Sequence, residues 1–200
     1  GKQKMAHTAT ATEYRPQSFS SLVGQDFVST AIKNSLNSQK IANAFLLSGP
    51  RGVGKTTTAR LIAKGLNCIH GPTGEPCNEC EICKGIADGS IMDVTEIDAA
   101  SNNSVDNIRE LRDDVNYVST RTKYRVYIID EVHMLSTGAF NALLKTLEEP
   151  PHHAIFILAT TEKHKILPTI LSRCQVYDFS RITVADTIHH LQYVAQQEGV

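Results

Sequence analysis

The chain has no excess of charge of either sign. Its 200 residues include 20 lysines and arginines against 21 aspartates and glutamates, which gives a formal net charge of −1. A nearly neutral chain has no general attraction to the phosphate backbone of nucleic acids. Any contact with DNA must therefore come from a local patch or from assembly with other subunits.

Long apolar runs are also missing. No stretch approaches the roughly 18 apolar residues of a membrane-spanning helix, and the N-terminal residues lack the apolar segment of a secretory signal. Internal repeats and low-complexity segments are absent from the sequence. We expect a cytoplasmic protein that does not contact membranes. The 41% hydrophobic and 20% charged residues are typical of a globular domain, and the length is sufficient for a buried core.

The chain has only five cysteines, and disulfides are rare in the cytoplasm. Four of these cysteines, Cys68, Cys77, Cys80 and Cys83, cluster in a segment rich in glycine and proline. Four thiolates can complete a tetrahedral zinc site that leaves no position for water or substrate, so such a site is structural. The alternatives are an iron–sulfur cluster, although the Cys-Pro run of bacterial ferredoxins is missing, and four thiols without a metal.

A phosphate-binding loop is the clearest motif. Residues 44–47 read as a buried strand and residues 57–66 as a helix, and Gly49-x-x-x-x-Gly54-Lys55-Thr56 between them fits the pattern G-x-x-x-x-G-K-[ST]. Such a loop turns consecutive backbone N–H groups toward one phosphate chain, at the positive end of the helix. We expect Lys55 to contact the β- and γ-phosphates of ATP and the Thr56 hydroxyl to bind Mg²⁺. The residues expected to bind the nucleotide here are Ser48, Gly49, Pro50, Arg51, Gly52, Val53, Gly54, Lys55, Thr56 and Thr57.

A second motif lies at residues 125–131, where an apolar run ends in Asp130 and Glu131. Buried parallel strands have such sequences, and nucleotide sites lie at their carboxyl ends. We expect Asp130 to hold Mg²⁺, through water, and Glu131 to orient or deprotonate the attacking water. His133 and Met134 are interpreted as packing or supporting groups.

The spacing of the remaining elements predicts an α/β fold. Strands near residues 45, 94, 126, 155 and 176 alternate with helices, which indicates a five-stranded parallel sheet with helices on both faces. We expect a helix over 138–147 to direct four side chains inward: Phe140, Leu143, Leu144 and Leu147. A polar residue after the strand at 154–159 can lie between the two motif strands and contact the γ-phosphate or the water.

Together these motifs resemble the AAA+ ATPases of bacterial DNA polymerase III clamp loaders. The resemblance extends over nearly all of residues 14–180 and is carried by Tyr14-Arg15-Pro16, Val23-Gly24-Gln25, the phosphate loop, the four cysteines, Glu96-Ile97-Asp98-Ala99-Ala100-Ser101, Ile129-Asp130-Glu131-Val132-His133, Thr160-Thr161 and Ser172-Arg173-Cys174. It implies an AAA+ P-loop NTPase domain over residues 1–180, with a small zinc module inserted after the P-loop helix at about 67–90. Residues 181–200 would begin a helical lid that is truncated here.

The resemblance also implies roles for individual residues. Thr161 matches the sensor-1 position, and Arg173 matches the arginine finger that acts in trans on ATP held by a neighbouring subunit. Val23 and Arg15 match the segment that lines the adenine pocket. Together with Lys55, Asp130 and Glu131, these assignments complete the expected catalytic and cofactor-binding set.

The implied function is that of a motor subunit. ATP, Mg²⁺ and Zn²⁺ would be its cofactors, and its partners would be other clamp-loader subunits in a hetero-pentameric ring, the sliding clamp and primed DNA. Nucleotide binding and hydrolysis would drive loading of the clamp during replication. The alternatives are another AAA+ DNA motor, such as a branch-migration helicase, and a non-catalytic zinc-binding scaffold subunit.

Overall fold

The computed structural model describes residues 17–19, 22, 24–180, 191–192 and 195–196. Arg15, Val23 and most of the expected lid helix lie outside these residues. Within the described part of the chain, no helix is both long and apolar enough to cross a membrane.

A five-stranded parallel sheet forms the centre of the domain, as the sequence predicts. Its strands are β1 (Ala44–Ser48), β2 (Val94–Asp98), β3 (Arg125–Asp130), β4 (Ala154–Thr160) and β5 (Gln175–Asp178). Their spatial order is β2-β3-β4-β1-β5, so β1 lies between β4 and β5. Every residue of β1 and β4 is buried, because both are interior strands covered on two faces.

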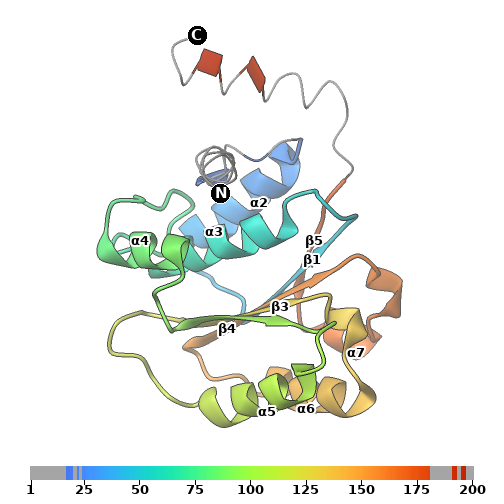
Figure 1. The fold of residues 1–200 in the computed structure, drawn as a ribbon. Helices are drawn as coiled ribbons and strands as arrows, with labels where there is room; N and C mark the ends of the chain where they lie inside the picture. Colours follow the sequence, from blue (N-terminus) through green and yellow to red (C-terminus); the bar gives the residue numbers. More distant parts are fainter. Residues whose placement is uncertain (1–16, 20–21, 23, 181–190, 193–194, 197–200) are drawn as a thin grey trace, which may run out of the picture.

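Helices cover both faces of the sheet (Figure 1). One face carries α2 (Asp26–Asn37), α3 (Lys55–Asn67) and α4 (Glu81–Asp88), and the other carries α5 (Ser104–Asp114), α6 (Thr137–Glu148) and the short α7 (Pro168–Leu171). Two single-turn 3₁₀ helices, η2 (Val132–Met134) and η3 (Lys163–Lys165), follow β3 and β4.

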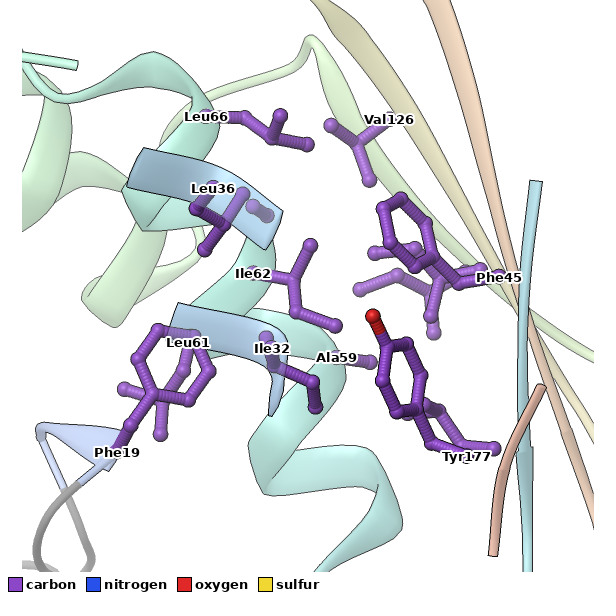
Figure 2. Close-up of a cluster of buried hydrophobic side chains, with 14 of the residues drawn as sticks. Phe19, Ile32, Leu36, Phe45, Ala59, Leu61, Ile62, Leu66, Val126 and Tyr177 are labelled. Carbon is purple, nitrogen blue, oxygen red and sulfur yellow. The ribbon is translucent and has the colours of Figure 1, made fainter. Parts of the chain in front are cut away.

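Alternate residues of each interior strand contribute to two separate cores. Phe45 and Leu47 of β1 point into the core beneath α2 and α3, whereas Ala44 and Leu46 point toward α5 and α6. Figure 2 shows the first core, where Ile32 of α2 and Ile62 of α3 meet Phe45 and Tyr177 of the sheet. This two-residue period is why strands covered on both faces read as continuous apolar runs.

The α6 helix directs the four predicted side chains toward the core. Leu143 and Leu147 are buried, Phe140 and Leu144 are half-buried and pack against the same core, and Ala139 and Thr146 are buried in addition. The buried stripe therefore runs along the i, i+4 row from Ala139, and the two larger side chains lie beside it.

Candidate nucleotide-binding site

A cavity of about 580 Å³ lies at the carboxyl ends of the strands, where β1 leads into the glycine-rich loop. Its lining residues are Arg51, Gly52, Gly54, Lys55, Thr56, Thr57, Asp98, Ala100, Asp130 and Glu131. The two sequence motifs therefore meet in one place, although about 75 positions separate them in the chain. The predicted Ser48 and Val53 are buried, and Val53 is part of the hydrophobic core, so both support the loop from behind.

Two glycines permit the path of the loop. Gly54 has a φ of +96° and is the N-terminal cap of α3, a left-handed conformation that costs glycine no steric energy. At Gly49, an added Cβ would lie 2.8 Å from both the Cβ and the carbonyl oxygen of Phe179. The backbone of Phe179 donates its N–H to the Ser48 carbonyl at 2.6 Å, so the strand end and the loop are joined at this point.

Lys55 is the first residue of α3, and its side chain folds back over the loop. Its ammonium group donates hydrogen bonds to the carbonyl oxygens of Gly49 and, at 2.7 Å, of Pro50. Burial lowers the pKa of Lys55, while the nearby charges of Glu131 and Asp130 act in the opposite direction. The cation is thus held inside the phosphate loop and faces the two carboxylates.

Asp130 ends β3 and lies beside Asp98, its register partner at the end of β2. Its Oδ1 accepts a hydrogen bond from the backbone N–H of Glu131 at 3.0 Å. Burial raises the pKa of Asp130, and the charges of Glu131 and Asp98 raise it further. Together with the Thr56 hydroxyl, this cavity offers hard oxygen donors of the kind that Mg²⁺ prefers, so the residues fit that ion. Sequence reasoning gave Asp98 no role, although its position at the end of a strand was a usable signal.

Glu131 follows β3 in a left-handed conformation with φ at +53°, which is uncommon for a residue other than glycine. The Thr161 hydroxyl donates a hydrogen bond to Glu131 Oε2 at 3.2 Å, and His133 Nε2 lies 3.5 Å from the same oxygen. The structure therefore brings the predicted Thr161 to the predicted Glu131. It also brings His133, interpreted from the sequence as a packing or supporting group, and Thr160, at the end of the strand expected to place a polar residue here, next to them.

Arg173 lies apart from this cavity. It is exposed between α7 and β5, and its Nη1 donates a hydrogen bond to the Glu148 carbonyl oxygen, at the end of α6, at 3.4 Å. Within one chain, Arg173 is therefore a surface residue outside the nucleotide pocket.

The four predicted cysteines converge in a second site. The sulfur atoms of Cys68, Cys77, Cys80 and Cys83 all lie within 4.8 Å of one another. Backbone N–H groups in the same segment donate to the sulfurs of Cys68, Cys77 and Cys80 at 3.3 to 3.4 Å. Burial disfavours the Cys80 thiolate, but hydrogen bonds from Cys83 and Ile69 outweigh this effect and lower the pKa of Cys80 to about 6. Four cysteine sulfurs this close together fit the ligand set of a structural zinc ion.

The sheet order, the phosphate loop, the acidic pair after β3 and the threonines after β4 define the fold of this chain as that of an AAA+ domain. The family model described as DNA polymerase III, delta subunit, matches residues 24–183, and the chain belongs to that family.

Curated relatives agree with this assignment. The chain is 56% identical to DNA polymerase III subunit tau of Bacillus subtilis, over 97% of this chain and 34% of that protein. It is 48% identical to subunit tau of Escherichia coli, over 98% of this chain and 30% of that protein. It is 50% identical to subunit gamma/tau of Mycobacterium tuberculosis, over 94% of this chain and 33% of that protein. The chain thus spans about a third of the length of these relatives.

Solved structures share the fold. The Holliday junction branch migration motor RuvB of Thermotoga maritima has a TM-score of 0.63 at 18% identity, and the match covers 94% of this chain and 55% of that one. A DNA polymerase III gamma subunit-related protein from the same organism has a TM-score of 0.51 at 23% identity, and the match covers 80% of this chain and 47% of that one. At these identities the likeness concerns the fold alone.

Proposed function

We propose that this chain is the ATPase core of a motor subunit in the bacterial DNA polymerase III clamp loader. The observation that carries the proposal is the convergence of Lys55, Asp130 and Glu131 on one cavity, in a chain of this family. The sliding clamp, primed DNA and the other ring subunits would be its partners, and the cytoplasm its location.

The geometry supports a separate role for each residue of the site. Lys55 and the N-terminal end of α3 would bind the β- and γ-phosphates. Thr56 and Asp130 would hold Mg²⁺, which supplies charge stabilisation at the phosphates when bound. Glu131 would accept a proton from the attacking water, and Thr161 would steady its carboxylate through their hydrogen bond. Arg173, exposed and outside its own cavity, would serve the site of a neighbouring subunit.

Two alternatives remain open to experiment. A branch-migration helicase would share the fold with RuvB, but the identity to that protein is 18%, against 56% to a DNA polymerase III subunit. A non-catalytic scaffold would have no use for a lysine and two carboxylates directed into one cavity. Both alternatives predict no dependence of ATP turnover on a sliding clamp.

The proposed function is tested by steady-state ATP turnover of the full-length protein, assembled with its partner subunits. We expect strong stimulation that requires both the sliding clamp and primed DNA. Turnover that is indifferent to the clamp would contradict the clamp-loader assignment. An unwinding assay on branched DNA would then test the helicase alternative.

We also propose that the four cysteines hold a structural zinc ion, and Lys64 supports this assignment. Lys64 is only 3% exposed, and its ammonium group donates to two neutral amide oxygens, Gln17 Oε1 at 2.6 Å and Asn78 Oδ1 at 2.9 Å. Burial lowers the pKa of Lys64, whereas the neighbouring Cys83 raises it. Buried charges need a compensating charge, and a zinc ion with four thiolates has a net charge of −2 that the ammonium group would partly offset.

Replacing Lys64 with methionine should therefore weaken zinc binding. We expect a loss of about 10-fold or more in zinc affinity, within the range seen when groups that support metal ligands are removed. Competition with a chromophoric chelator on the full-length protein measures this affinity. The matched control is Lys84→Met, because Lys84 is an exposed lysine on α4. Equal zinc retention by the Lys64 and Lys84 variants would contradict the electrostatic role.

A further inference from the structure

Two side chains lie at the same oxygen of the Glu131 carboxylate. Thr161 Oγ1 donates to Oε2 at 3.2 Å, and His133 Nε2 lies 3.5 Å from the same atom. Both contacts fall on Oε2, and Glu131 lines the cavity. The backbone at Glu131 is left-handed, which is uncommon for a residue other than glycine.

His133 connects Glu131 to the end of β4. Its side chain is 7% exposed, and its other ring nitrogen, Nδ1, lies 2.8 Å from Thr160 Oγ1. Thr160 is fully buried, and its Oγ1 accepts a hydrogen bond from the Glu162 backbone N–H at 2.9 Å. A line of polar contacts therefore runs from the β4 terminus through the imidazole ring to the carboxylate.

These contacts favour one tautomer of His133. The Thr160 hydroxyl accepts from the Glu162 backbone N–H and has its own hydrogen left to donate, and the neighbouring His133 Nδ1 can accept it. In a neutral imidazole, the ring nitrogen that does not accept bears the proton. In this arrangement the N–H group is on Nε2, which faces Glu131 Oε2.

We propose that His133 is a positioning residue for ATP hydrolysis: its Nε2–H holds the Glu131 carboxylate in place, and Thr160 fixes the tautomer that allows this. The inference rests on the proposed ATPase function. In that reaction the water oxygen forms a bond to the γ-phosphorus, the bond from that phosphorus to the bridging oxygen breaks, and ADP leaves. The water proton passes to Glu131, so a misdirected carboxylate slows this step without changing how ATP is bound.

Two substitutions of His133 separate its contacts. His133→Asn retains an amide oxygen near the Nδ1 position for Thr160 but loses the group that reaches Glu131. His133→Gln retains an N–H donor near the Nε2 position. We expect kcat of the assembled full-length protein to fall about 10- to 100-fold in His133→Asn, as for a small misplacement of a catalytic group, with KM and binding of a fluorescent ATP analogue unchanged. His133→Gln should restore most of kcat.

Substitutions of Thr160 test the same proposal independently. Thr160→Val removes the hydroxyl group at nearly constant volume and should lower kcat, whereas Thr160→Ser keeps the hydroxyl group and should not. His153→Asn is the matched control, because His153 Nε2 contacts a backbone oxygen, that of Val115, at 2.8 Å. His153 lies just before β4 begins, whereas the nucleotide site is at the opposite end of that strand.

The outcomes distinguish the inference from the function on which it rests. Wild-type kcat in His133→Asn, or equal losses in the Asn and Gln variants, would show that the imidazole only fills space and would overturn the inference alone. A wild-type assembly that binds ATP but does not hydrolyse it, with clamp and DNA present, would overturn the proposed function and the inference with it.

Discussion

Replacement of Arg173 with alanine should reduce stimulated ATP turnover of the assembled complex by about 10³-fold or more at the sites it serves, the effect of removing an arginine finger. The reason is its position. The side chain is exposed and contacts its own chain through the Glu148 carbonyl oxygen, outside the cavity that holds Lys55 and Glu131. Its planar guanidinium group is thus available to a phosphate bound by a neighbour.

The measurement compares turnover with nucleotide binding in the same complex. Binding should remain close to wild type, because the cavity of each chain is untouched. Arg173→Lys keeps the charge but loses the fork of donors and should recover little activity. Arg109→Ala is the matched control, since Arg109 is also exposed and lies 4.0 Å from Asp106. If Arg173→Ala retains stimulated turnover, this arginine is an ordinary surface residue.

Replacement of Glu131 with glutamine should separate ATP binding from hydrolysis. Glutamine keeps the size of the side chain and an oxygen that can accept the Thr161 hydrogen bond, but it cannot take a proton from water. We expect turnover to fall by about 10²- to 10⁴-fold, the usual contribution of a general base, while the affinity for ATP stays within a few-fold of wild type.

Two further variants define the meaning of that result. Lys55→Ala should lose ATP binding itself, because the Lys55 ammonium group lies within the phosphate loop. Glu96→Gln removes a carboxylate from β2 that pairs with Arg60 at 2.5 Å, and it should leave hydrolysis unchanged. Rapid hydrolysis by Glu131→Gln would mean that another group lining the cavity, such as Asp98, activates the water.

The sequence by itself determined the parts of this protein that depend on local pattern. The phosphate loop, the acidic pair and the cysteine cluster are short motifs whose residue types already limit their chemistry. The strands could be located because burial on both faces requires continuous apolar runs. Buried stripes such as Ile32 and Leu36 of α2 are visible as a helical period, although at α6 that period did not distinguish Phe140 and Leu144 from the fully buried residues.

Only the tertiary structure decided which distant residues meet. Strands with similar apolar composition do not reveal their spatial order, and it is the order β2-β3-β4-β1-β5 that puts Asp98 beside Asp130. The same order aligns the ends of β3 and β4, so that His133 contacts Thr160 and Glu131 contacts Thr161. Lys64 likewise meets Asn78 and Gln17 through folding of the loop. Such polar contacts follow no period along the chain, because they satisfy groups that burial has removed from water.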